Sequence, residues 1–315
     1  MRKTLRKNAG HFFLLAIAAA GIFGTGCGGS SHGAAVSSDY AAPVAVGVIE
    51  ADDIKESSGL AASECQDILW THNDAGGDAV IFAMDLRGKH LGAWKVPNAR
   101  NIDWESIAGY KDQTGKCFLI IADIGDNDAA RTELQIYRIP EPAASQETAA
   151  ARITNPLAAA PAETLKFTYA DRPHNAETVL IHPLTGDIYI VTKEKKGPAF
   201  VHRIKPDFNS SAVVRTDKVA DISMPAKPEG LLTGGSFAPD GQRVMLCDVQ
   251  HGYELSLPAN AAGPEAIWAQ NPVIVDLGDR KQGEGVSYAR DGVSLYASSE
   301  KKNTPIFQIR RKTAQ

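Results

Sequence analysis

The chain has 315 residues, of which 43% are hydrophobic and 22% charged, and its net charge is -4. This composition excludes an intrinsically disordered protein, because disordered chains contain fewer apolar and more charged residues. The acidic balance argues against a nucleic-acid partner, because binding to a phosphate backbone requires a basic surface. Beyond the N-terminal segment, no apolar run approaches the ~20 residues that a membrane-spanning helix needs.

Residues 1–26 have the pattern of an export signal: four cations precede an apolar run that is too short for a membrane span. The run ends at Cys27, and a Gly/Ser-rich stretch follows. Small residues before a cysteine resemble a bacterial lipobox, although Gly24 stands where a leucine-like residue is usual. The resemblance implies cleavage before Cys27, a diacylglycerol group on its thiol and a flexible tether over residues 27–42. We therefore expect an exported lipoprotein that is held at a bacterial membrane and faces the periplasm or the exterior; an ordinary signal peptide is the alternative.

Short β-rich runs, separated by turn residues, fill the rest of the chain. One kind of run ends in polar residues and recurs five times, at 68–74, 118–127, 188–194, 244–249 and 295–300. A second kind follows each of them, at 80–86, 134–140, 200–206, 253–258 and 306–312. Repetition with a period of roughly 50 residues is typical of a β-propeller. We expect one all-β propeller over residues 43–313, with five four-stranded blades; six blades are the alternative.

Each blade also needs an inner and an outer strand. Runs that start at Ser58, Glu105, Glu177, Thr233 and Glu284 supply the inner strands, and runs at 90–96, 164–169, 213–222 and 272–277 supply four outer ones. The last repeat lacks an outer strand, which the N-terminal run 43–51 can provide, so that no sheet edge stays unpaired. The Ala/Pro-rich stretch 141–163 is predicted to be an insertion in the second repeat.

Three cysteines follow Cys27. Cys65 and Cys117 occupy similar places in consecutive repeats, so they could form a disulfide between neighbouring blades. Cys247 lies in an apolar run and is predicted to be a buried strand residue rather than a nucleophile.

The first residues of the inner strands predict a polar ring around the propeller axis. Three of the five ring residues are acids, namely Glu105, Glu177 and Glu284. Three carboxylates that lie close together repel one another unless a cation or basic side chains offset them. Oxygen-rich surroundings suit Ca²⁺, so these three glutamates are the predicted metal ligands. The alternative is that each of them binds backbone amides of the adjacent blade and has no chemical role.

Further polar residues at the ends of the next strands are predicted to line the same mouth of the channel. The candidate ligand-binding residues are Asn73, Asp74, Asp126, Asn127, Arg131, Lys193 and Glu300. Candidate groups for proton transfer are Asp123, His174 and Glu194. Asp and Asn are also common turn formers, and a lone histidine such as His174 is often an ordinary loop residue.

Seven segments that carry these residues resemble exported bacterial β-propellers of the phytase-like or esterase-like kind and, more loosely, the SdiA-regulated propeller group. They span residues 55–300 and are 56–60, 73–76, 103–108, 122–127, 136–138, 174–177 and 283–285. The resemblance implies a propeller with an axial, Ca²⁺-dependent site. Ser58 and Thr233 interrupt the dense acidic cluster that alkaline phytases of this shape use to bind several calcium ions.

Two functions follow from these observations. The first is a lipid-anchored envelope module, expected to be monomeric, whose acidic mouth binds a small ligand or an envelope partner, with Ca²⁺ as a possible cofactor. The alternative is a metal-dependent hydrolase of phosphoesters, esters or lactones. Motifs of serine hydrolases, zinc peptidases and nucleotide-binding proteins are not found in the sequence, and the fold alone does not decide between binding and catalysis.

Overall fold

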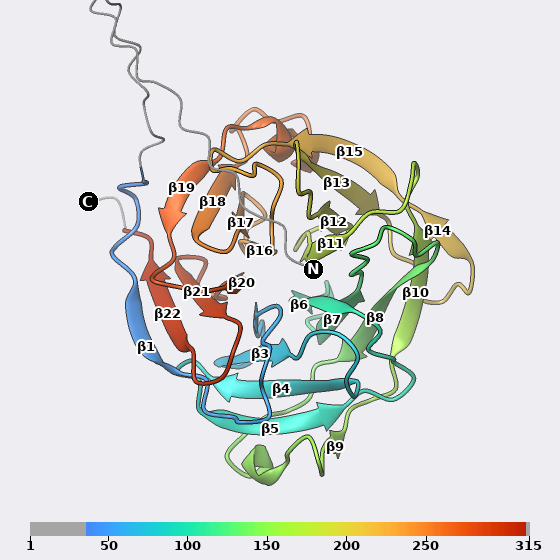
Figure 1. Ribbon diagram of the computed structural model, residues 1–315, viewed down its shortest axis with the longest axis vertical. Coiled ribbons are helices and arrows are strands. Elements are labelled where there is room, and N and C mark those ends of the chain that lie inside the picture. Colours follow the sequence, from blue (N-terminus) through green and yellow to red (C-terminus); the bar gives the residue numbers. More distant parts are fainter. Residues whose placement is uncertain (1–35, 313–315) are drawn as a thin grey trace, which may run out of the picture. The chain divides into compact units, whose positions relative to one another are not determined.

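The β-rich runs form strands that are buried along almost their whole length. All residues of β3 (Ile68–His72), β7 (Cys117–Asp123) and β12 (Ile188–Thr192) are buried. Continuous burial means that both faces of each sheet are covered, as expected when sheets pack face to face around an axis. In the computed structural model, which describes residues 36–312, the strands form five sheets around a central channel (Figure 1).

Each sheet is a propeller blade in which four strands pair antiparallel and follow one another from the channel outwards. Blade 1 contains β2 (Ala61–Ala62), β3, β4 (Val80–Asp85) and β5 (His90–Lys95). Blade 2 contains β6 (Trp104–Lys111), β7, β8 (Leu134–Pro140) and β10 (Glu163–Thr168). Blade 3 contains β11 (Ala176–Ile181), β12, β13 (Ala199–Ile204) and β15 (Asp217–Ile222). Blade 4 contains β16 (Gly234–Phe237), β17 (Arg243–Cys247), β18 (His251–Ser256) and β19 (Val273–Asp276).

Blade 5 closes the ring with both ends of the described chain. Its inner strands are β20 (Gly283–Tyr288), β21 (Ser294–Ser299) and β22 (Pro305–Arg310), and the N-terminal β1 (Val44–Val48) pairs with β22 at the outer edge. The predictions of five four-stranded blades and of closure by an N-terminal strand are therefore confirmed. Packing begins before residue 43, because Val36 is bridged to Ile274 and the buried Tyr40 donates a hydrogen bond to Glu254. The predicted tether thus reaches into the packed region; Cys27 and the signal lie outside the described residues.

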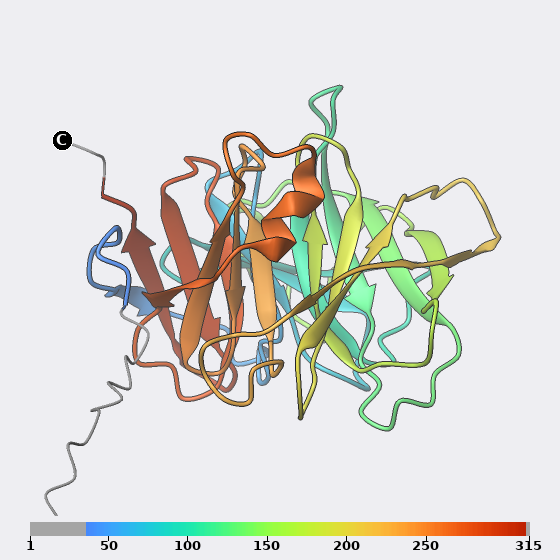
Figure 2. The same cartoon turned by 90° about the horizontal axis from the view of Figure 1, so that it is seen from above.

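The hydrophobic core is divided among the five contacts between neighbouring blades. Trp70 and Ile81 of blade 1 share one cluster with Trp104 and Leu119 of blade 2, and four further clusters fill the other contacts. The 3₁₀ helix η2 (Pro264–Ala269) packs on β15 and β18, and Figure 2 shows it at the outside of the ring. Within residues 36–312, no helix has the length and apolar character needed to cross a membrane.

Two segments depart from the four-strand pattern. The predicted outer strand 213–222 is in fact two strands: β14 (Val213–Arg215) pairs with β10 of blade 2, and β15 belongs to blade 3. The chain changes sheets at the buried Thr216, whose amide donates to the Thr168 carbonyl. The predicted insertion contains the 3₁₀ helix η1 (Thr148–Ala150) and β9 (Leu157–Ala158), and β9 pairs with β5 of the preceding blade.

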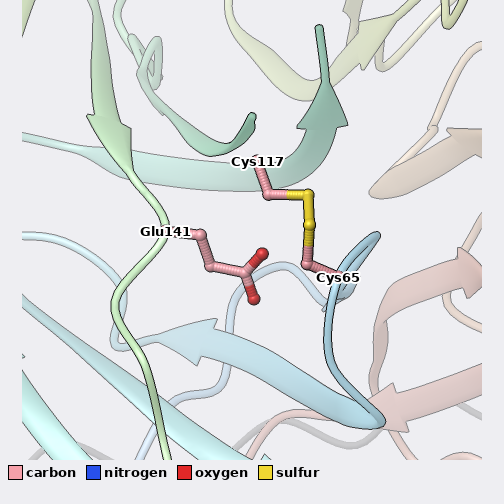
Figure 3. Close-up of side chains that lie close together, drawn as sticks. All are labelled: Cys65, Cys117 and Glu141. Carbon is pink, nitrogen blue, oxygen red and sulfur yellow. A yellow bond between two sulfur atoms is a disulfide. The ribbon is translucent and has the colours of Figure 1, made fainter. Parts of the chain in front are cut away.

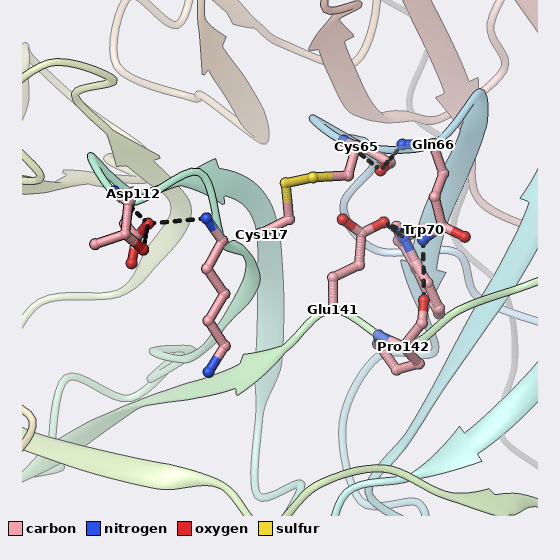
Figure 4. The surroundings of a disulfide bond; sticks show 10 residues. Cys65, Gln66, Trp70, Asp112, Cys117, Glu141 and Pro142 are labelled. Carbon is pink, nitrogen blue, oxygen red and sulfur yellow. Dashed lines mark hydrogen bonds between the residues drawn. A yellow bond between two sulfur atoms is a disulfide. The ribbon is translucent and has the colours of Figure 1, made fainter.

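A disulfide joins Cys65, in the turn between β2 and β3, to Cys117 at the start of β7 (Figure 3). It links blades 1 and 2, which confirms the predicted pairing, and Cys247 is free and buried in β17 as expected. Glu141 accepts hydrogen bonds from the Trp70 indole and the Gln66 amide, both at 2.8 Å, beside this disulfide (Figure 4). The first residue of the insertion therefore ties blade 2 to blade 1.

Candidate functional site

Three glutamates occupy the same place in three innermost strands. Glu105, Glu177 and Glu284 are the second residues of β6, β11 and β20, and each lies where the pairing with the next strand shifts. A β-bulge of this kind re-aims the side chain of the extra residue. All three glutamates are buried. These strands surround the propeller axis (Figure 1), and Glu177 lies close enough to Glu105 and to Glu284 to raise the pKa of both, so the three glutamates gather at one mouth of the channel.

The two ring residues that are not acids have a different part in the structure. The Ser58 hydroxyl donates to the backbone carbonyl of Glu105, and the Thr233 hydroxyl donates to that of Gly283. Both bonds run from one innermost strand to that of the next blade. Thr233 therefore has a structural role, whereas the Ser58 hydroxyl also lies 3.3 Å from Oε2 of Glu105. None of the three glutamate carboxylates accepts a hydrogen bond from a backbone amide of the described residues.

Further charges surround the three glutamates. One carboxylate oxygen from each of Asp74, Asp103 and Glu105 lies within 4.8 Å of the other two. Lys193 follows β12 and places its Nζ 2.5 Å from both oxygens of Glu177. Glu300 and Asp74 are close enough to raise the pKa of Glu177 and of Glu284. We call this group the acidic mouth, and its members are Asp74, Asp103, Glu105, Glu177, Lys193, Glu284 and Glu300.

Burial and mutual repulsion raise the pKa values of the three ring glutamates in the acidic mouth. Burial, and then the nearby Glu177, raise the pKa of Glu284 to about 9. The same two causes raise the pKa of Glu105. Burial also raises the pKa of Glu177, although Lys193 opposes this shift. Without an added cation, part of the acidic mouth is therefore protonated at neutral pH.

The composition of the acidic mouth fits a hard divalent cation. Ca²⁺ takes roughly 6–8 oxygen ligands, mostly from carboxylates, carbonyls and water. The acidic mouth offers carboxylates from four different blades, and Lys193 is its one cation among the described residues. Gly125 lies against these carboxylates: a Cβ atom there would come within 2.3 Å of Asp103 and 2.6 Å of Glu105. The glycine of the 122–127 segment thus leaves room for the acids. Neither Asp103 nor Gly125 was among the predicted site residues.

Several predicted residues lie next to the acidic mouth but have structural partners. Arg131 forms an ion pair of 2.8 Å with the fully buried Asp123, which also accepts hydrogen bonds from the amides of Ile102 and Asp103. Asp123, predicted to handle a proton, therefore holds the turn that carries Asp103. Asp126 accepts from the amides of Ala130 and Arg131.

The side-chain amides of Asn73 and Asn127, both predicted to bind a ligand, form hydrogen bonds with segments that precede innermost strands. Asn73 accepts from the amides of Lys55 and Glu56 and donates to the Asp53 carbonyl, so it fixes the chain before blade 1. Asn127 accepts a long hydrogen bond, 3.5 Å, from Asn175. Within residues 36–312, neither side chain forms a hydrogen bond with a carboxylate of the acidic mouth.

His174 and Glu194, also predicted for proton transfer, form a separate group in blade 3. His174 is buried, its Nδ1 lies 3.2 Å from Glu194 and its Nε2 lies 3.0 Å from Asp171. The ring packs against Tyr169, Phe200 and His202. Neither residue is among the charges that shift the pKa values of the three ring glutamates.

The opposite end of the channel has a different character. It holds a cavity of about 210 Å³, lined among others by Glu64, Tyr110, Ser236 and Ser287. The nearby Cys65, Cys117 and Glu141 lie close together, but the disulfide removes both thiolates as metal ligands (Figure 3). The charged residues that line this cavity, Glu64, Lys111 and Asp112, are of both signs, unlike the predominantly acidic mouth.

Comparisons with known proteins do not assign the chain to a family. No protein-family model matches the chain, and no curated protein matches it. A gluconolactonase from Xanthomonas campestris is a similar solved structure, with 8% identity, a TM-score of 0.47, and coverage of 86% of this chain and 89% of that one. The soluble aldose sugar dehydrogenase of Escherichia coli has 9% identity, a TM-score of 0.45, and coverage of 86% and 99%. Because both TM-scores are below 0.5 and both identities below 10%, we draw no conclusion from these likenesses, and the phytase-like or esterase-like character stays a prediction.

Proposed function

We propose that the acidic mouth binds a divalent cation, Ca²⁺ in the first place, and that the propeller holds a small polar ligand through this ion. The observation that carries the proposal is the close approach of carboxylate oxygens of Asp74, Asp103 and the buried Glu105, within 4.8 Å of one another. Carboxylates at this distance, of which Glu105 is buried and the two aspartates are partly exposed, repel one another unless they are protonated or share a cation. A bound ion removes this repulsion and therefore stabilises the fold.

The residues divide between holding the ion and orienting the ligand. Asp74, Asp103 and Glu105 would hold the cation, with Glu284 close by. The ion supplies a positive charge that attracts anionic or hydroxyl-rich groups. Lys193 is 23% exposed and already paired with Glu177, so it offers remaining N–H donors to the same ligand.

The test is to measure bound metal by mass spectrometry and thermal unfolding with EDTA and then with added Ca²⁺. An ion that binds only the folded state raises the Tm by mass action. We expect about one Ca²⁺ per chain, an EDTA-sensitive Tm, and loss of both in Glu105→Gln. Glu64→Gln is the matched control, because Glu64 lines the opposite end of the channel. A metal-free protein whose Tm ignores EDTA and Ca²⁺ would contradict the proposal.

Hydrolysis of phosphoesters, esters or lactones is the second candidate, and one observation favours it. Glu284 is a buried acid whose pKa is raised to about 9, first by burial and then by Glu177. An acid that keeps its proton at neutral pH can donate it to a leaving group. Glu284 is better placed beside a bound cation than Asp123, His174 or Glu194, which have the other partners described above.

A screen of generic phosphoesters, esters and lactones separates binding from hydrolysis. A hydrolase should release product, and Glu284→Gln should lower kcat by about 10²–10⁴-fold if this acid takes part in proton transfer. Saturable binding of a polar ligand without product would instead support the binding module. Turnover that is unchanged in Glu284→Gln would exclude this residue as the acid.

We further propose that the protein works as a monomer at the cell envelope, anchored through a lipid on Cys27. Support comes from the leader pattern and from the Cys65–Cys117 disulfide, because disulfides persist in oxidising compartments outside the cytoplasm. The partner at this location is a small molecule or an envelope component. Cys27→Ala should move the protein from the membrane fraction to the soluble one, and mass spectrometry of the wild-type N-terminus should show the diacylglyceryl group. An unmodified Cys27 would contradict the anchor.

A further inference from the structure

We propose that blade 3 carries a second metal site, separate from the acidic mouth, which binds a transition metal such as Zn²⁺ through Asp171, His174 and His202. A ring nitrogen of each histidine and a carboxylate oxygen of Asp171 lie within 4.8 Å of one another. Asp171 and His174 lie in the connection between β10 and β11, and His202 comes from β13. The fold thus brings together ligands from two separate parts of the blade.

In both histidines the Nδ1 atom is bound to a group outside the proposed ligand set. The Nδ1 of His174 lies 3.2 Å from Glu194, and the Nδ1 of His202 lies 3.0 Å from the Thr216 hydroxyl. Metal-ligating histidines are usually held in this way, with one ring nitrogen bound to a carboxylate or another oxygen and the other turned to the metal.

The two remaining nitrogens differ in their partners. The Nε2 of His174 lies 3.0 and 3.1 Å from the two oxygens of Asp171. The Nε2 of His202 is fully buried and has no hydrogen-bond partner among the described residues. A buried polar atom without a partner is unfavourable, and a metal ion between these groups would satisfy it.

Aromatic packing fixes the two imidazoles around this position. The Tyr169 ring lies 4.9 Å from the His174 ring and 4.7 Å from the His202 ring, and Phe200 lies 5.2 Å from His174. In all three contacts the rings meet edge to face, so the packing restricts the orientation of both imidazoles. The Asp171 side chain is 42% exposed, which gives an ion a route from solvent to the buried histidines.

The donor set selects the class of metal. Two imidazole nitrogens and one carboxylate suit Zn²⁺ and similar ions, whereas Ca²⁺ prefers oxygen alone. Zinc–ligand distances of about 2.0–2.2 Å place two ligands of a tetrahedral ion about 3.3–3.6 Å apart, so the observed cluster needs only a small adjustment. Three protein ligands leave a fourth position for water or a ligand atom. This site does not depend on the function proposed for the acidic mouth.

The test is a titration of the full chain with Co²⁺, in which the visible absorption of the bound ion is measured. Zn²⁺ is then added as a competitor. We expect one equivalent to bind, with the intense bands of four-coordinate Co²⁺. Asp171→Asn should weaken binding at least tenfold, and His202→Gln should abolish it. Glu194→Gln should weaken it by about 10–100-fold through the orientation of His174.

Two controls make the result decisive. His182→Gln changes another buried histidine, whose Nδ1 accepts from the Thr185 amide outside this cluster, and should leave Co²⁺ binding unchanged. Glu105→Gln should also leave it unchanged while removing Ca²⁺ from the acidic mouth. If His202→Gln fails to fold, the half-exposed Asp171→Asn decides. Absence of Co²⁺ binding, or binding that is equal in Asp171→Asn, would overturn the proposal.

Discussion

The two ends of the channel use the same innermost strands for opposite purposes. Where these strands start, Glu105, Glu177 and Glu284 lie on β-bulges, buried and close to one another. Further along, Ser236 and Ser287 occupy regular positions and accept hydrogen bonds from the amides of Tyr288 and Ala62 in the next blade. The starts of these strands therefore gather acids, whereas the two serines further along join neighbouring blades through hydrogen bonds.

The contrast between the two ends indicates which part of this symmetric fold carries the function. Ring closure requires only that neighbouring blades pack and pair their polar groups, which the serines and the Cys65–Cys117 disulfide achieve. Burial and mutual repulsion raise the pKa values of Glu105 and Glu284, so these carboxylates lower stability when they are ionised. Such unfavourable features are typical of functional sites. The unfavourable charges of the acidic mouth therefore indicate that this end of the channel is the binding site.

Removing the disulfide should have the largest effect on stability. Cys65 and Cys117 are 52 residues apart, and the entropy of a closed loop of this length corresponds to about 4 kcal/mol. We expect Cys65→Ala/Cys117→Ala to lose this amount in urea unfolding. The loss should be the same with EDTA and with Ca²⁺, because the disulfide lies away from the acidic mouth. A loss that depends on Ca²⁺ would show that the two ends are coupled.

Lys193→Met should have the next largest effect, because it leaves Glu177 without its cation. We expect a loss of about 2–3 kcal/mol at pH 8, below the value for a fully buried pair since Lys193 is partly exposed. The loss should shrink at pH 5, where the carboxyl groups of the acidic mouth bind protons. Lys205→Met, at a lysine after β13 that is outside the acidic mouth, is the control. Equal losses at both pH values would show that charge repulsion is not the cause.

The repeats made the fold and the axial position of the ring predictable. Aligned residues such as Phe82 and Tyr137 fall in the third strands of their blades, and the glutamates fall at the starts of innermost strands. Position along the axis follows from the repeat, but the direction of a side chain depends on local irregularities. Gly125 and the β-bulges are such irregularities, and no repeat pattern reveals them. For the same reason Arg131 and Asp123 looked like channel residues, although they pair with each other.

The blade 3 cluster was missed for a related reason. Asp171, His174 and His202 are brought together by the pairing of β11, β12 and β13, which the sequence does not specify residue by residue. One signal was available: His202 and Glu254 stand in the repeat position that Phe82, Tyr137 and Phe307 occupy in the other blades. A polar residue at a repeat position that is otherwise aromatic indicates that it has a buried polar partner. His202 indeed meets Thr216, and Glu254 meets Tyr40.

The smallest of these effects is a pH dependence of the acidic mouth. Burial and Glu177 raise the pKa of Glu284 from its ordinary value of 4.5 to about 9, so the folded state binds more protons than the unfolded state between these values. Stability must therefore fall as pH rises through this window. We expect the metal-free protein to lose stability between pH 5 and pH 8, and Glu284→Gln to lose less, because the amide does not ionise. Saturating Ca²⁺ should flatten the wild-type profile, since a bound cation favours ionised carboxylates. Urea unfolding at each pH measures both changes. A wild-type profile that Ca²⁺ leaves unchanged would mean that protons alone offset the charge of this mouth.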